Sequence, residues 1–195
     1  MMKVAKYSFV YIDPLKTGSQ TLDKFFRRMG GKHLVYDSNL DKHRRYITEP
    51  ELQSWNLCAS VRNPYTRAYS LWNMDRTKKI THHGIRLDSF ENYMEDIIDL
   101  CEKNPDSDSL NVYRYYSCNQ YLKPFDIPDK FIIKMETMKA DLERLGFNTG
   151  RSLPIRNIGK YNGIKSRKDA ESPAFIDLVN QWAGSDFKKY GYDKL

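Results

Sequence analysis

The stretch YIDPLKTGSQTLDKFF, residues 11–26, contains the features that decide the fold of this chain. An apolar segment ends at Ile12, and a lysine and small polar residues follow it. A helix is then predicted over residues 19–29, because Leu22, Phe25, Phe26 and Met29 follow the i, i+3, i+4, i+7 spacing of one helix face. A strand, a tight loop and a helix N-terminus in this order are typical of an anion-binding site.

The rest of the chain alternates between strand and helix patterns. Strands are predicted at 7–12, 55–61 and 130–134, with a short one at 33–36. Helices are predicted to begin near residues 48, 64, 88, 136 and 172, with a further helical stretch ending at 122. This alternation predicts an α/β fold in which residues 1–195 form a single domain, with a mainly parallel central sheet flanked by helices.

Composition narrows the classes of protein. The chain has 195 residues and a formal charge of +7, which suits an anionic ligand. Its three cysteines are far apart in the sequence and indicate buried thiols rather than a metal cluster or a disulfide framework. The start of the chain lacks a signal-peptide pattern, and no apolar run reaches the roughly 18 residues that span a bilayer. We therefore expect a cytoplasmic protein with no membrane partner and no metal.

The loop after Ile12 is the first candidate site. Gly18 permits a tight turn, Lys16 adds a mobile positive charge, and Thr17, Ser19 and Thr21 add hydroxyl donors. Backbone amides at a helix N-terminus favour an anion, and here they belong to Thr17, Gly18, Ser19, Gln20 and Thr21. The alternative is an ordinary turn in which Ser19 is the N-cap and Lys16 points into solvent.

A second candidate site follows the strand predicted at 55–61. Arg62 comes directly after that strand, and Ser70 lies about two turns into the next helix. A guanidinium group can hold a phosphate with two hydrogen bonds, and a hydroxyl can donate a third. The alternative makes Arg62 a surface ion pair and has Ser70 bond to its own helix backbone. Two such sites on successive strand–helix units suggest one ligand with two separated anionic groups.

The two motifs PLKTGSQTL and SVRNPYTRAYSLW together resemble the cofactor motifs of sulfotransferases, in particular the carbohydrate-sulfotransferase-like branch. NQYL, FIIKMETMKADLERLGF and DFKKYGYD extend the similarity through most of the chain. The resemblance implies a P-loop-like sulfotransferase fold and 3′-phosphoadenosine 5′-phosphosulfate (PAPS) as cofactor. It also implies that the loop at Lys16 binds the 5′-phosphosulfate, and that Arg62 and Ser70 bind the 3′-phosphate. One departure is that Leu15 stands between Pro14 and Lys16, where the family usually has proline directly before lysine.

The resemblance implies transfer of a sulfuryl group to a hydroxyl of a carbohydrate or a small hydroxylated acceptor. Lys16 would meet the charge that develops on the leaving phosphate, and His43 is the first candidate for the base. Glu49 and Asp37 are alternative bases, and Arg156 and Lys160 in a late basic loop are further cofactor contacts. His33 is expected in the core, and His82 and His83 in a loop near the acceptor.

Two other classes of function compete with this one. A P-loop kinase or nucleoside triphosphatase has the same order of elements, but the chain lacks the GxxxxGK[ST] spacing. A noncatalytic polyanion-binding protein fits the positive charge and the 14 tyrosines. The paired motifs favour the sulfotransferase, with no nucleic-acid partner, and the sequence does not define an oligomeric state.

Overall fold

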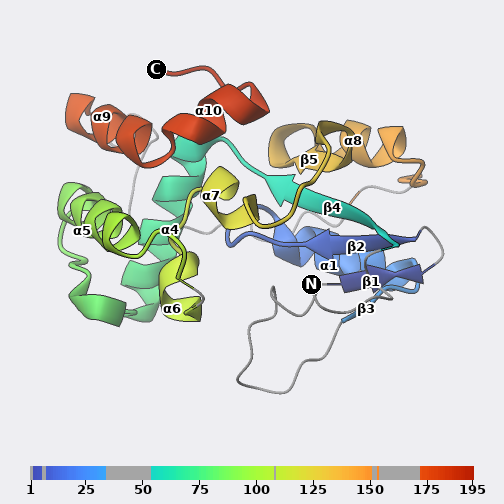
Figure 1. The fold of residues 1–195 in the computed structure, drawn as a ribbon, viewed down its shortest axis with the longest axis horizontal. Coiled ribbons are helices and arrows are strands. Elements are labelled where there is room, and N and C mark those ends of the chain that lie inside the picture. The colour runs from blue at the N-terminus through green and yellow to red at the C-terminus, as the bar shows by residue number, and fades with distance from the viewer. Residues whose placement is uncertain (1, 6–7, 34–53, 108, 151–152, 154–171) are drawn as a thin grey trace. The chain divides into compact units, whose positions relative to one another are not determined.

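The structure is a computed structural model that describes residues 2–5, 8–33, 54–107, 109–150, 153 and 172–195. Its contacts divide the chain into two compact units, each built from two segments. The first unit comprises Met1–Val61 and Pro124–Arg156, and the second comprises Arg62–Lys123 and Asn157–Leu195. Figure 1 shows strands in the first unit, and the described elements of the second are helical.

The first unit contains a mixed sheet with the strand order β3-β1-β2-β4-β5. Its strands are β1 (Met2–Val4), β2 (Phe9–Ile12), β3 (Lys32–His33), β4 (Asn56–Val61) and β5 (Ile132–Lys134). β2, β4 and β5 are parallel neighbours, whereas β1 is antiparallel to both β2 and β3. The connection from Val4 to Phe9 is too short for a crossover of about a dozen residues, which explains the reversed direction of β1.

Two helices cover one face of this sheet through a single hydrophobic cluster. They are α1 (Ser19–Arg28) and α8 (Met138–Arg144), and α8 is preceded by the 3-10 helices η3 (Asp129–Phe131) and η4 (Met135–Thr137). Phe26 of α1 packs against Tyr11 and Phe147, with ring centroids 5.1 and 5.3 Å apart. Leu22 and Leu142 are fully buried in the same cluster. The apolar face of α1 therefore packs against the sheet, and this packing holds the helix next to β2.

Side chains of α8 bond to the backbone of β5, which is the last of the described strands on its side of the sheet. The carboxylate of Asp141 accepts a hydrogen bond from the Lys134 amide at 2.9 Å. The guanidinium of Arg144 donates to the carbonyls of Ile132, at 2.9 Å, and Lys130. Asp141 and Arg144 are themselves paired at 3.2 Å. These contacts satisfy backbone groups of β5 that a further strand would otherwise use.

The described elements of the second unit are helices, and side chains cap the starts of four of them. They are α4 (Pro64–Lys78), η2 (His82–Gly84), α5 (Phe90–Lys103), α6 (Leu110–Tyr113), α7 (Cys118–Leu122), α9 (Pro173–Trp182) and α10 (Gly184–Tyr190). The side chains of Asn63, Ser89, Ser117 and Ser172 accept amide hydrogen bonds at the starts of α4, α5, α7 and α9. Each cap satisfies a helical N–H that has no partner inside its own helix.

The buried carboxylate of Asp186 connects α10 to α7. Its two oxygens accept from the amides of Cys118 at 2.7 Å and Asn119 at 2.8 Å, while Ser117 accepts from Gln120. All three amides at the start of α7 are thereby bonded. The segments NQYL and DFKKYGYD meet here, through the contact between Asn119 and Asp186, which are 67 residues apart.

The α/β class predicted from the sequence is confirmed, and the sheet is mixed rather than mainly parallel. The helices predicted to begin near 64, 88 and 172 are confirmed as α4, α5 and α9, and the strand predicted at 55–61 as β4. The helical stretch ending at 122 is two short helices, and α10 was not predicted. The helix start at 48 lies outside the described residues.

Candidate functional site

The loop between β2 and α1 has a backbone suited to an anion. Lys16 and Gly18 both have positive φ, at 68° and 87°, and Thr17 between them does not. Alternation of left-handed with other residues can turn successive N–H groups toward a common side, as in the concave nests that bind anions. A positive φ at a residue other than glycine costs about 1–2 kcal/mol, so the surrounding contacts must hold Lys16 in place.

Gly18, not Ser19, is the N-cap of α1, and it has no side chain that could cap this helix. The Gly18 carbonyl accepts from Thr21 at 2.9 Å and from Leu22 at 3.1 Å. A Cβ atom at position 18 would lie 2.8 Å from Cε of Met138, so the backbone passes close to α8. Because glycine has no side chain, the N-cap residue itself supplies no acceptor for the first amides of α1, the groups that bind anions at helix N-termini.

The hydroxyl groups of the loop differ in what they contact. Thr17 is fully buried, and its hydroxyl donates to the Pro14 carbonyl at 2.6 Å. In the structure this hydroxyl bonds within the protein, and the expectation that it donates to a ligand stays a prediction. Thr21 is 8% exposed, Ser19 is half-buried and Gln20 is exposed.

The second candidate site follows β4. The Arg62 Nε donates to the Thr66 hydroxyl at 3.0 Å, and that hydroxyl donates to the Asn63 carbonyl at 3.1 Å. The Asn63 side chain caps α4, so the first turn of this helix orients the guanidinium. Ser70 lies two turns into α4, as expected from the sequence, and is 1% exposed.

The structure places the predicted residues in two groups. Lys16 to Thr21 form one loop in the first unit, and Arg62 and Ser70 belong to the second. Strands β2 and β4 are parallel with Ile12 opposite Ala59, so the chain leaves both strands at the same edge of the sheet. Other predicted residues lie outside the described part of the chain, namely Asp37, His43, Glu49, Arg156 and Lys160. The His33 side chain is not described either, and His82 and His83 lie in η2.

A buried ion pair in the second unit was not predicted. Asp75 of α4 is fully buried and accepts from Arg114 at 2.7 Å and from the Tyr93 hydroxyl at 2.9 Å. Burial, and then the charge of Asp75, raise the pKa of Tyr93 well above its usual value. This cluster joins α4, α5 and the segment after α6, because the Asp75 carboxylate is the shared acceptor of Arg114 and Tyr93.

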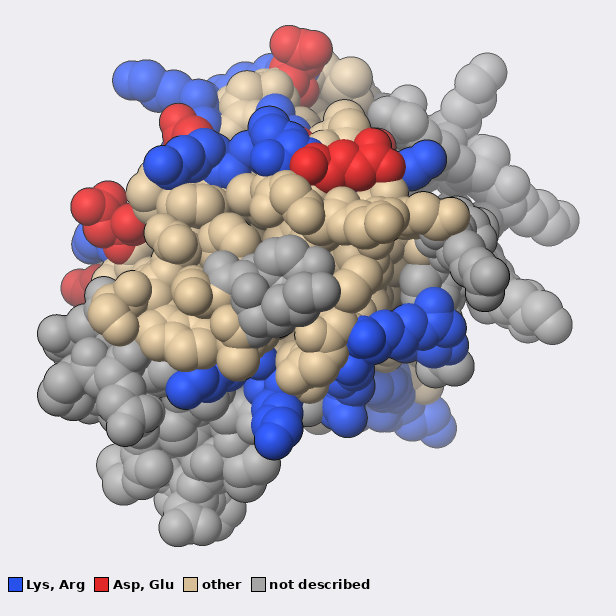
Figure 2. All heavy atoms as spheres, turned by 90° about the vertical axis from the view of Figure 1, so that its right-hand side faces the viewer, with Lys and Arg blue, Asp and Glu red and all other residues tan. Residues whose placement is uncertain are grey.

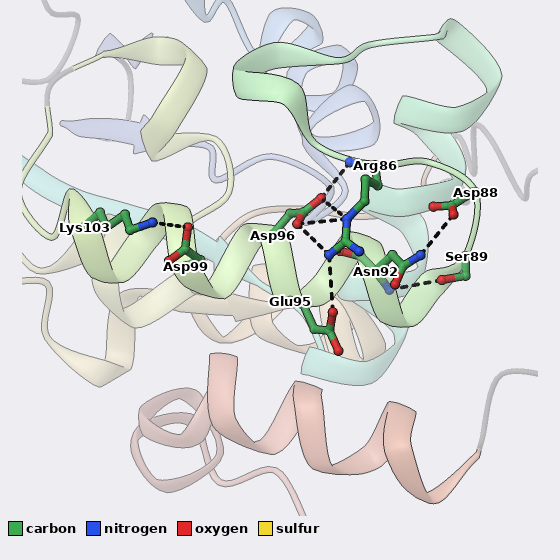
Figure 3. Close-up of polar contacts among 8 residues, drawn as sticks. All are labelled: Arg86, Asp88, Ser89, Asn92, Glu95, Asp96, Asp99 and Lys103. Atoms are coloured by element: carbon green, nitrogen blue, oxygen red, sulfur yellow. Dashed lines mark hydrogen bonds and ion pairs between the residues drawn. The ribbon is translucent and has the colours of Figure 1, made fainter.

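A second charged cluster lies on the surface of α5 (Figure 3). Arg86 bonds to both oxygens of Asp96, at 2.8 to 3.1 Å, and to Glu95 at 3.2 Å. The hydrogen bond from Arg86 lowers the pKa of Asp96. The guanidinium of Arg86 is therefore occupied by carboxylates, and this cluster is a poor candidate for an anion site.

Basic side chains gather in two groups on the face shown in Figure 2, with uncharged residues between them and acidic residues mixed into the upper group.

Among the described residues, no group of three or more His, Cys, Asp or Glu side chains is arranged to hold a metal ion. Within the same part of the chain, no helix has the length and apolar character needed to cross a membrane.

Comparisons of the chain with models of known families, with curated proteins and with solved structures give no match. The functional assignment therefore depends on the motifs and on the geometry of the two sites.

Proposed function

We propose that this protein is a PAPS-dependent sulfotransferase that acts on a hydroxyl of a carbohydrate or a small hydroxylated acceptor. The observation that carries the proposal is the loop at Lys16. It follows a buried parallel strand, alternates positive and negative φ, and leads into a helix whose N-cap is a glycine. Its pairing in sequence with Arg62 and Ser70 adds a second phosphate-binding motif at the next parallel strand.

In this proposal, the loop amides and Lys16 hold the 5′-phosphosulfate, and Arg62 holds the 3′-phosphate. PAPS supplies the sulfuryl group and leaves as 3′-phosphoadenosine 5′-phosphate. Lys16 neutralises the negative charge that grows at the phosphate end, which requires a positioned cation rather than a proton transfer. A base accepts the proton of the acceptor hydroxyl, and His43, Glu49 and Asp37 are its candidates.

The finer fold assignment is part of the same proposal. A single P-loop-like sulfotransferase domain over residues 1–195 is supported by the strand–loop–helix order at β2 and by the parallel strands β2, β4 and β5. The three free and buried cysteines agree with a reducing compartment, so we include the cytoplasm as the expected location.

The test of the cofactor site is calorimetry with two nucleotides. 3′-Phosphoadenosine 5′-phosphate carries both phosphates, and adenosine 5′-phosphosulfate lacks the one at the 3′ position. Arg62→Ala should weaken the first by about 10- to 100-fold, because hydrogen bonds to charged groups contribute about 1.5–3 kcal/mol. It should leave the second unchanged. Arg76→Ala is the control, since Arg76 lies in the last turn of α4, the helix that follows Arg62, and stacks on Trp72.

The test of the reaction is transfer of labelled sulfate from PAPS to a panel of glycans and small hydroxylated compounds. Lys16→Ala should lower the rate by about 100- to 1000-fold, as for the loss of one transition-state donor. Lys139→Ala removes an exposed lysine of the same unit and should have no effect. If the wild type binds neither nucleotide, or prefers ATP with magnesium, the proposal is wrong.

A further inference from the structure

Three buried hydroxyl groups form a continuous hydrogen-bonded chain next to the loop between β2 and α1. The hydroxyl of Tyr11 on β2 lies 2.7 Å from that of Ser60 on β4. The Ser60 hydroxyl lies 2.6 Å from that of Thr17, which contacts the Pro14 carbonyl at 2.6 Å. Ser60 and Thr17 are fully buried and Tyr11 is 2% exposed. The chain therefore connects two parallel strands to both ends of the turn that precedes α1.

The direction of every hydrogen bond in this chain follows from its last member. A carbonyl oxygen only accepts, so the single hydroxyl proton of Thr17 is directed to Pro14. Thr17 must then accept from Ser60, and Ser60 must accept from Tyr11. Hydrogen bonds that run in one direction polarise one another and hold their members in one orientation.

We propose that Ser60 and Tyr11 are positioning residues, which fix Thr17 and thereby hold Lys16 and Gly18 in their left-handed conformations. The inference rests on the proposed function in that the loop so held is the proposed 5′-phosphosulfate site. Thr17 is the residue between the two with positive φ, so its anchorage determines the directions of the amides on either side. Neither Ser60 nor Tyr11 needs to touch the ligand.

If Ser60 only stabilised the sheet, any shortening of a buried side chain at this place should have the same effect as Ser60→Ala. Cys58 lies two residues before Ser60 on β4, so both side chains are on the same face of the sheet, and both are fully buried. Cys58 belongs to the hydrophobic cluster and makes no part of the hydroxyl chain. Cys58→Ala is therefore the matched control, since it shortens a buried side chain on the same strand without touching the loop.

The experiment compares Ser60→Ala, Tyr11→Phe, Thr17→Val, Thr17→Ser and Cys58→Ala in the full chain. The first measurement is the amide chemical shift and hydrogen exchange of residues 16–19 without ligand. The second is the dissociation constant for 3′-phosphoadenosine 5′-phosphate. Ser60→Ala and Thr17→Val should shift these amides, speed their exchange and weaken binding by about 10- to 100-fold, as the loss of an orienting partner does at metal sites.

The remaining variants separate positioning from stability. Thr17→Ser keeps the hydroxyl and should keep the wild-type amide shifts. Tyr11→Phe should shift the amides of residues 16–19 in the same direction as Ser60→Ala, but by less. Cys58→Ala should lower stability and change binding by less than about twofold. The inference is overturned if Ser60→Ala affects residues 16–19 no more than Cys58→Ala does. If the wild type binds no nucleotide, the proposed function fails, while the amide shifts still decide whether the hydroxyl chain sets the loop.

Discussion

Replacing Asp186 by alanine should destabilise the second unit more than any loss of an exposed carboxylate there. Asp186 is 1% exposed and bonds with both oxygens to the amides of Cys118 and Asn119. Alanine leaves both amides without their acceptor at the start of α7. It also removes a negative charge that interacts with Arg67, which is fully buried.

The magnitude follows from the burial of the two amides. An unsatisfied buried donor costs about 1–3 kcal/mol. Cys118 is fully buried and should incur the full cost, whereas Asn119 is partly exposed and water can replace part of its bond. We therefore expect Asp186→Ala to lower the free energy of unfolding by about 2–4 kcal/mol. Asp186→Asn keeps one acceptor oxygen and should cost less than alanine.

Urea unfolding followed by tryptophan fluorescence measures this loss, because Trp72 and Trp182 both belong to the second unit. With an m-value of about 2 kcal/mol/M, the midpoint should fall by about 1–2 M while m stays constant. Asp177→Ala is the control, since Asp177 is an exposed residue of α9. Equal midpoints for Asp186→Ala and Asp177→Ala would refute the role given to Asp186.

Three further outcomes are expected. Burial raises the pKa of Asp186, so the folded protein favours the protonated carboxyl. The free energy of unfolding of the wild type, relative to that of Asp186→Asn, should therefore be highest below about pH 4 and fall as the pH rises through the raised pKa. Urea titrations from pH 3.5 to 7 measure this difference. Gly18→Ala should lower the free energy of unfolding by about 1–2 kcal/mol because of the positive φ, and further because the new methyl group would lie close to Met138. Gly30→Ala, with φ 82° and no neighbour within 4 Å, should show the effect of the positive φ alone in the same urea assay. Burial also raises the pKa values of the three cysteine thiols, to about 12 for Cys101 and Cys118. An aromatic disulfide reagent at pH 8 should therefore label the unfolded protein and not the folded one. Rapid labelling of the folded chain would contradict the burial of Cys58, Cys101 and Cys118.

Elements with a local signal could be predicted from the sequence. The stripe on α1 and the apolar run of β4 each indicate their element without tertiary information. Ser89 marks the start of α5 by its hydrogen bond to Asn92, and Ser172 marks that of α9 in the same way. The division between α6 and α7 also had a signal, because Ser117 and Gln120 have the spacing of a capping box.

Features that depend on distant residues could not be predicted. Thr17 and Ser60 are 43 residues apart in the chain, and only the parallel pairing of β2 and β4 brings them together. A threonine before a glycine in a turn looks like a solvent-facing donor until the strand beside it is known. In the same way, nothing local indicates that Asp186 caps a helix 68 residues earlier.

The contacts between α8 and β5 have a consequence for self-association. An unprotected edge strand is a template on which a second chain can add a strand, and this is a common route to aggregation. Here a carboxylate and a guanidinium from one short helix occupy backbone groups of β5. The sheet is therefore closed to growth on that side by two charged side chains, and a protein engineer who shortens Arg144 or Asp141 would reopen it.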